Sequence, residues 1–305
     1  MTDAVAVYGK IPAAADFVRV NTGLFQRAGL DRWFQEGIEH LHRERTRLPA
    51  EPARFLLFSA QAAQPLVGAF APGQDGLGRA FPVVVCADLP GGSPGDDLSL
   101  APLRFASLLD AAAGLAVAAQ SLTAAELAAR AAALSSGRPT ASSCPSLSTL
   151  LGGASVSEIR TTGDPAYALT TLVAACAQAR RAKAGSPGRA LTLDGQADSA
   201  AARAFWLELA RRHLGAEQPS ALWAQKNGRL LIALGPAPSL VLAYWADPTH
   251  SSPRRWPLCT ANAAARARAL ARLSPVQARL LARADASLAD VLSAFSEAAC
   301  RHEGK

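Results

Sequence analysis

The charged side chains most able to do chemistry are expected in loops beside strand ends. Lys10, Asp16 and Arg19 follow one short apolar run, and Asp75 and Arg79 lie between two others. Polar groups on the loops of a rigid sheet are where functional sites tend to lie. Two acids and three bases include no evident nucleophile. Three interpretations therefore stay open: a salt-bridge network that locks the N-terminal loop onto a hairpin, a partner-binding surface, or a catalytic site.

The second group of these charges is predicted to lie in the tip of a β-hairpin. The apolar runs Leu66–Phe70 and Phe81–Cys86 flank a segment rich in Gly and Pro, which is typical of two strands joined by a long polar tip. An acid and a base four residues apart in this tip are close enough to pair. Such a tip needs positive φ, and three of its glycines can take positive φ at little steric cost. These are Gly73, Gly76 and Gly78.

The predicted elements occur in the same order in both halves of the chain. In the first half a strand precedes a helix with apolar residues at helical spacing from Leu30 to Leu41, and three strands and further helices follow. In the second half a strand and a helix precede three strands and the C-terminal helices. The predicted segments are Ala190–Leu193, Asp198–Leu214, Ala221–Gln225, Arg229–Leu234 and Leu240–Trp245, with helices from Ser274-Pro275 onward. Two β-α-β-β-β-α halves predict an α+β fold of antiparallel-rich β-sheets flanked by helices, in α/β/α layers.

Composition suggests how the chain is divided. Residues 135–165 are rich in Ser, Thr, Gly and Pro with little periodicity, which predicts a linker or long surface loop. Residues 1–134 are then an N-terminal domain, and residues 166–305 a second α+β half with C-terminal helices.

Charge and cysteine usage restrict the class of protein. The net charge of +7 comes mostly from Arg spread along the chain, whereas a nucleic-acid binder concentrates its charge, so an acidic partner surface is favoured over nucleic acid. The five cysteines form no C-x-x-C pair and the N-terminus has no secretory signal, which predicts a cytoplasmic protein with reduced thiols. The sequence contains no run of about eighteen strongly apolar residues, so no membrane span is predicted. No zinc, Walker or Rossmann motif occurs, so no metal and no cofactor are expected.

The motifs of the first eighty residues, taken in order, resemble the opening of the TagF (ImpM) family of type VI secretion-associated proteins. The matched positions are Tyr8, Gly9, Lys10, Pro12, Asp16, Phe17, Val18, Arg19, Trp33, Arg54, Phe55, Gly68, Pro72, Asp75, Gly78, Arg79, Phe81 and Pro82. Three places depart from the family pattern: Ala15 replaces a glycine, Ala53 replaces a tryptophan, and Gly73-Gln74 replaces a Ser-x pair. Further along, Leu222-Trp223 resembles the family's SLWW stretch.

The resemblance implies a function without turnover. Members of the family are post-translational regulators that repress type VI secretion by acting on a cytoplasmic forkhead-associated scaffold protein, with no cofactor. The matched positions would then be partner-binding or structural residues. Two other classes stay open: a small hydrolase or transferase that uses the Lys10, Asp16 and Arg79 loops, and a platform module for a small GTPase, in which a similar element order occurs. The oligomeric state stays unknown.

Overall fold

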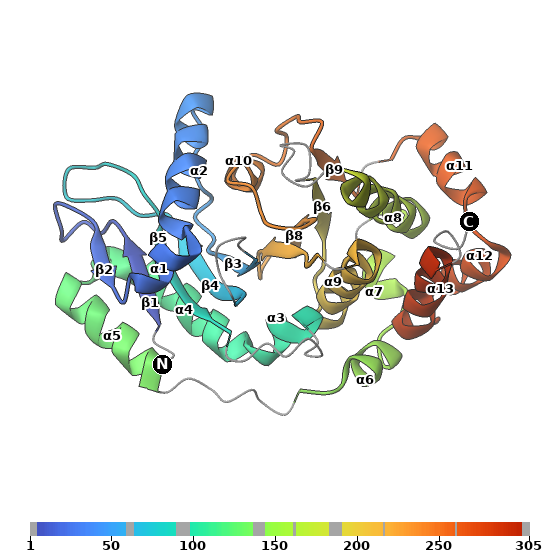
Figure 1. The fold of residues 1–305 in the computed structure, drawn as a ribbon, viewed down its shortest axis with the longest axis horizontal. Helices are drawn as coiled ribbons and strands as arrows, with labels where there is room; N and C mark the ends of the chain where they lie inside the picture. The colour runs from blue at the N-terminus through green and yellow to red at the C-terminus, as the bar shows by residue number, and fades with distance from the viewer. Residues whose placement is uncertain are drawn as a thin grey trace.

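Within the residues that the structure describes, nine strands form a single open sheet. This computed structural model describes residues 5–58, 64–89, 98–136, 144–160, 163–182, 191–215, 217–259 and 261–300. The strand order is β2-β1-β5-β4-β3-β7-β8-β6-β9, and the only parallel pair among these is β6 with β9. Helices cover both faces of the sheet (Figure 1). The predicted α+β class, an antiparallel-rich sheet in α/β/α layers, is confirmed.

The first half contains the predicted hairpin and one strand that was not predicted. Its strands are β1 (Ala6–Gly9), β2 (Val18–Val20), β3 (Ala53–Leu57), β4 (Leu66–Ala71) and β5 (Val83–Asp88). Its helices are α1 (Gly23–Ala28), α2 (Leu30–Glu44), α3 (Ala101–Arg104), α4 (Ala106–Ala118) and α5 (Ala124–Ser136), with short 3-10 turns at Leu98–Leu100 and Ala119–Ser121. The hairpin is β4 with β5, in the register that pairs Phe70 with Val84. The additional strand β2 pairs antiparallel with β1 and forms the edge of the sheet.

The second half differs from the prediction at two strands, because β9 was not predicted and one predicted strand is a helix. Its strands are β6 (Thr192–Gln196), β7 (Ser220–Trp223), β8 (Arg229–Ala233) and β9 (Arg255–Pro257), and its first helix is α9 (Ala200–Leu214). The predicted strand Leu240–Trp245 is wrong, because residues Val241–Ala246 form the helix α10. All of its residues from Val241 to Trp245 are buried, and a segment buried on every side has no polar periodicity that separates helix from strand.

The two halves join directly, because β3 pairs antiparallel with β7 and places Phe55 opposite Leu222. The segment 135–165, predicted as a linker, contains the short helices α6 (Leu147–Gly152) and α7 (Ser157–Arg160) in its described part. The remaining helices are α8 (Pro165–Arg181), α11 (Ala263–Ala271), α12 (Pro275–Ala282) and α13 (Leu288–Cys300). The division into domains at these boundaries stays a prediction.

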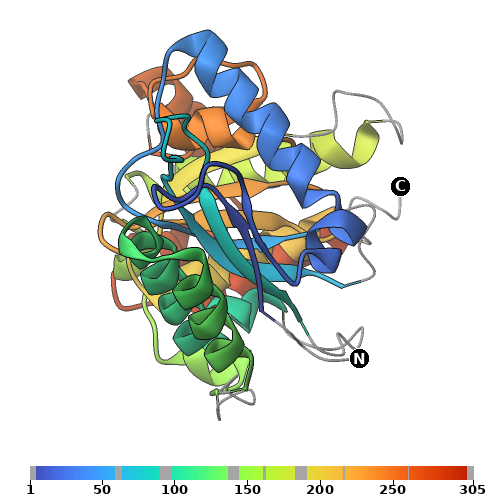
Figure 2. The same cartoon turned by 90° about the vertical axis from the view of Figure 1, so that its left-hand side faces the viewer.

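Alternation along the strands divides the core between the two faces of the sheet. On β4, Val67 and Ala69 belong to one apolar cluster, while Leu66 and Phe70 belong to the other, as the period of two requires. Figure 2 shows α2 on one side of the sheet and α4 and α5 on the other. Burying a Val, Leu or Phe side chain stabilises the fold by about 1.5–3 kcal/mol, so both layers hold the strand ends and their loops in place.

Helix length and composition also bear on membrane insertion. Among the described residues, no single helix is long and apolar enough to cross a membrane, and one pair bent by 63°, Leu98–Arg104 with Ala106–Ser121, meets the length and composition criteria only when taken together.

Candidate protein-interaction site

A buried ion cluster lies where the hairpin tip meets the loop after β1. The Asp75 carboxylate is inaccessible to solvent, and its Oδ2 lies 3.0 Å from Lys10 Nζ and 2.7 Å from Arg79 Nε. The Lys10 side chain is largely buried, whereas that of Arg79 is 55% exposed. Of the five charged residues singled out in the sequence, Lys10, Asp75 and Arg79 therefore meet. Asp16 is exposed, and its Oδ1 accepts a hydrogen bond from the backbone N–H of Phe17.

The same carboxylate organises the backbone of the tip. Its Oδ1 accepts hydrogen bonds from the N–H groups of Leu77 (3.0 Å) and Arg79 (2.9 Å). The Arg79 guanidinium also donates to the Ala15 carbonyl at 2.7 Å, and the Gly76 N–H donates to the Ala14 carbonyl at 3.1 Å. The tip is thus tied both to itself and to the loop after β1.

The glycines of the tip have different roles from those predicted. Of the three glycines that can take positive φ, only Gly78 does so (+78°). A Cβ on Gly73 would instead lie 2.6 Å from the carbonyl oxygens of Lys10 and Phe81. At this position glycine is needed because two backbone segments approach closely, and not for its φ angle.

Electrostatics keep the Asp75 carboxylate charged. Burial alone would raise its pKa, but hydrogen bonds from the Arg79 N–H, from the Lys10 and Arg79 side chains and from the Leu77 N–H outweigh burial, so the pKa lies well below its usual range. A carboxylate that accepts this many hydrogen bonds stays ionised at every physiological pH.

Aromatic motif residues pack beside the ion cluster. Tyr8 stacks on Phe17 with ring centroids 4.9 Å apart, and Phe81 meets Phe17 edge-on at 4.8 Å. The Phe17 ring also faces two cations, Lys10 Nζ at 5.0 Å and the Arg19 guanidinium at 5.7 Å. Burial raises the pKa of the Tyr8 hydroxyl, so Tyr8 is neutral and acts as a packing residue.

The close contact between β1 and β5 explains two further motif positions. A Cβ on Gly9 would lie 2.3 Å from the Pro82 carbonyl oxygen and 2.6 Å from Val83 Cα, and Gly9 has φ +156°. No side chain fits there without moving one strand. Gly9 and Pro82 therefore have a structural role, which brings Lys10 against the hairpin tip.

Besides Asp16, two predicted site residues lie outside this cluster of charges and rings. Pro12 is exposed in the loop after β1. Trp33 lies on α2, and its indole N–H donates to the Ala237 carbonyl, 2.7 Å away in the loop before α10. Trp33 therefore connects the two halves of the chain.

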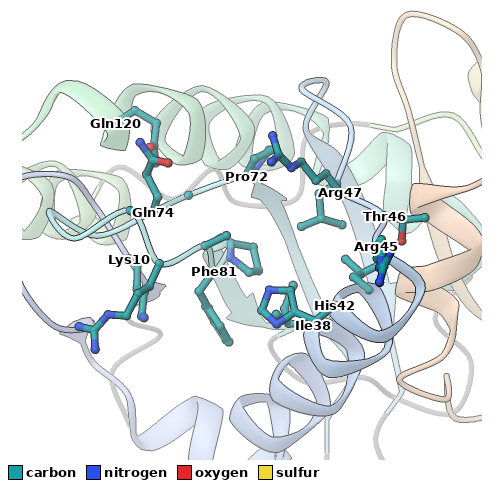
Figure 3. Close-up of a pocket in the computed structure, with 17 residues that line it drawn as sticks. Lys10, Ile38, His42, Arg45, Thr46, Arg47, Pro72, Gln74, Phe81 and Gln120 are labelled. Atoms are coloured by element: carbon teal, nitrogen blue, oxygen red, sulfur yellow. The ribbon is translucent and has the colours of Figure 1, made fainter.

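A basic cleft opens next to the ion cluster, between the hairpin tip and the C-terminal end of α2. It has a volume of ≈ 1110 Å³, and its positively charged or titratable lining residues are Lys10, His42, Arg45, Arg47 and Arg79. Figure 3 shows Lys10 and Gln74 on one side and Arg45, Thr46 and Arg47 on the other, with His42 and Phe81 between them. Sequence reasoning missed the α2 side, although the high density of basic residues from His40 to Arg47 was a usable signal.

The basic cleft carries more positive charge than its carboxylate can balance. No Asp or Glu is among the described residues that line it, and within the described part of the chain neither Arg45 nor Arg47 forms an ion pair. Asp75 lies behind the lining and is shared by two cations. The described residues also contain no group of three or more His, Cys, Asp or Glu that could hold a metal ion. The arrangement can attract and bind anionic groups.

Comparison with known proteins finds a family model and solved structures that are similar to this chain. Residues 6–134 match the family model described as TagF N-terminal domain, Type VI secretion system-associated. Among solved structures, the crystal structure of PA0076 from Pseudomonas aeruginosa PAO1 is similar, with 18% identity over 82% of this chain and 96% of that chain and a TM-score of 0.49. No curated protein matches the chain significantly.

Fold and site together define the class: an α+β protein whose N-terminal loops form a pinned, positively charged surface. Within that class, residues 6–134 match the TagF N-terminal domain, which is described as type VI secretion system-associated. The resemblance drawn from the sequence motifs is confirmed for these residues.

Proposed function

We propose that the protein is a non-enzymatic, post-translational repressor of a type VI secretion system, and that it acts in the cytoplasm by binding a forkhead-associated scaffold protein. The family match supports a role in type VI secretion. The mode of action is supported by the way the charged motif residues are used.

The observation that carries the proposal is that the motif charges bond to one another. Lys10 and Arg79 both bond to Asp75, whose two oxygens accept four hydrogen bonds or ion pairs in total. A general base or nucleophile needs a free lone pair at a substrate, and these groups have none to offer. An arrangement that holds loops in a fixed shape suits recognition, which needs a surface but no turnover.

The test is direct binding between two purified proteins. The full chain and the forkhead-associated protein of the same secretion system are mixed in an isothermal titration calorimeter, with a forkhead-associated protein from an unrelated pathway as the control. The expected result is a saturable complex with the first protein and none with the second. In cells, raising the level of this chain should reduce secretion without lowering the level of the apparatus proteins. If the wild-type chain does not bind the forkhead-associated protein, the proposal is wrong.

A further inference from the structure

The basic cleft brings the cations at the end of α2 opposite those of the Asp75 cluster. Cations at the end of α2 are favoured by the negative end of the helix dipole, which accounts for Arg43 and for the position of Arg45, and Asp75 holds Lys10 and Arg79 together. Neither effect accounts for Arg47 beyond the helix, or for the two groups of cations lining one cleft. Asp75 balances one of these charges, and the remaining like charges repel one another, so an anionic ligand would relieve that repulsion.

The backbone at Arg45 is the second observation. Arg45 ends α2 in the left-handed region (φ 54°, ψ 31°), with its N–H donating to the carbonyls of Leu41 and His42. Glycine is favoured at such a position, because a side chain with a Cβ is strained there. An arginine therefore occupies a C-cap position that favours glycine, at the edge of the cleft.

Size and chemistry narrow the class of ligand. A cleft of ≈ 1110 Å³ exceeds the roughly 300–1,000 Å³ of small-molecule sites. Binding of single-stranded nucleic acid uses exposed aromatic rings on which bases stack, whereas the described lining residues include no Trp or Tyr and their single Phe, Phe81, is 5% exposed. At the tip beside the cleft, the Leu77 side chain is 73% exposed and follows the pinned Asp75. Cations next to an exposed apolar side chain on a hydrogen-bonded backbone suit a polypeptide.

We infer that the basic cleft binds an extended acidic segment of a partner protein, whose carboxylates pair with Arg45, Arg47 and Arg79 and whose apolar residue contacts Leu77. This inference deepens the proposed function, on which it rests for the existence of a protein partner, and assigns its binding surface. Arg79 keeps one side on Asp75 and is 55% exposed on the other, so it can pair with a second carboxylate.

The first experiment measures binding of a defined acidic chain. Fluorescein-labelled poly-glutamate is titrated with the full-length protein at low and physiological salt, with anisotropy as the readout. The double variant Arg45→Glu/Arg47→Glu should bind at least about tenfold more weakly. The matched control is Arg266→Glu/Arg268→Glu, which changes the net charge equally at two exposed arginines of α11, also two residues apart. It should bind like the wild type, and an equal loss in both variants would overturn the inference.

A second variant separates binding from folding. Arg45→Gly removes one cation and relieves the left-handed strain at the end of α2. It should raise the melting temperature while weakening poly-glutamate binding by about threefold, the scale of a single exposed ion pair. A stabilised variant with unchanged affinity would remove Arg45 from the site. Tighter binding of oligo-dT than of poly-glutamate, lost in Arg45→Glu/Arg47→Glu, would assign the cleft to nucleic acid instead.

The forkhead-associated protein then distinguishes this inference from the proposed function. If it binds the wild type and Arg45→Glu/Arg47→Glu equally well, the cleft assignment is wrong and the proposed function stands. If it does not bind the wild type, while poly-glutamate binds in an Arg45- and Arg47-dependent way, the cleft assignment stands and the partner is another acidic protein.

Discussion

Two buried carboxylates, one in each half of the sheet, are each bonded by two cations, and they differ in their surroundings. Asp194 on β6 pairs with Arg229 of β8 at 3.0 Å and with Arg255 of β9, whose side chains are 12% and 11% exposed. Asp75 pairs with Lys10 and with Arg79, whose side chain is 55% exposed. The Asp194 cluster is closed, whereas the Asp75 cluster opens on the basic cleft.

Each cluster has one positive charge more than its carboxylate balances. The two clusters differ in which groups bond to the cation that is left unbalanced. Around Asp194, the remaining donors of both guanidinium groups bond to backbone carbonyls. Arg229 donates to the carbonyls of Tyr244 and Trp245, and Arg255 donates to that of His250. Around Asp75, Arg79 uses one further donor on Ala15 and leaves the rest toward solvent. A carboxylate with two cations thus joins strands in the second half, whereas in the first half it leaves donors of Arg79 exposed for a ligand.

The largest expected effect is on the closed cluster. Asp194→Asn keeps the shape but leaves two arginines buried without a counter-charge, so the free energy of unfolding should fall by about 3–5 kcal/mol. Urea denaturation measures it. Asp285→Asn, which removes an exposed pair with Arg283 (side chains 75% and 65% exposed), is the control and should barely shift the midpoint. Equal midpoints for the two variants would contradict the structural role of Asp194.

Removing the Asp75 carboxylate should lower the overall stability less than Asp194→Asn does, and should increase hydrogen exchange in the hairpin tip more. In Asp75→Ala, Arg79 can turn to water, so the melting temperature should fall by less than in Asp194→Asn. The amides of Leu77 and Arg79 lose their acceptor, and their hydrogen exchange should accelerate. In Asp194→Asn, exchange of these two amides should stay as in the wild type. Unchanged protection in Asp75→Ala would mean that the tip is held in another way.

The low pKa of Asp75 also predicts how the open cluster responds to acid. A carboxyl whose pKa is lower in the folded than in the unfolded state contributes stability above its unfolded pKa, and that contribution is lost as pH falls through the folded value. Because the unfolded pKa of Asp is about 3.9, the contribution should be complete at neutral pH and decline below about pH 4. Melting curves of the wild type and Asp75→Ala should therefore converge as the pH is lowered through this range, and curves that stay parallel would contradict the assigned pKa direction.

The sequence predicts the open cluster better than the closed one, and the reason is distance along the chain. Asp75 and Arg79 lie in one hairpin tip with recognisable glycines, and the first strand delivers Lys10 next to it. Asp194 meets Arg229 and Arg255 across 35 and 61 residues. The second contact depends on β9, a short parallel edge strand that contains Pro257 and has no alternating pattern.

Other features also were predicted correctly where they depend on neighbouring residues, and missed where they depend on tertiary contacts. The helix start predicted at Ser274-Pro275 is confirmed at α12, where Ser274 and Gln277 form a capping box whose donors and acceptors lie within three residues. The helix α10 was predicted as a strand because burial on all sides hides the periodicity that distinguishes the two. The α2 side of the basic cleft was missed because exposed arginines at a helix end are ordinary in sequence, and only the fold places them opposite Lys10 and Arg79.

The smallest effects are expected for Arg→Lys substitutions in the Asp75 and Asp194 clusters, which change the geometry of a cation and keep its charge. Arg79→Lys loses the fork that reaches both Asp75 and Ala15, but this side chain is half in solvent, so the free energy of unfolding should change by less than about 1 kcal/mol. Arg229→Lys should cost about 2 kcal/mol, since it abandons bonds to Asp194 and to the carbonyls of Tyr244 and Trp245 in a closed site. Poly-glutamate affinity should be retained in both variants, because the charge of the cleft is unchanged. If Arg79→Lys unfolds as easily as Arg229→Lys, the Asp75 cluster is as closed as its counterpart, and the surplus charge assigned to the cleft is not available to a partner.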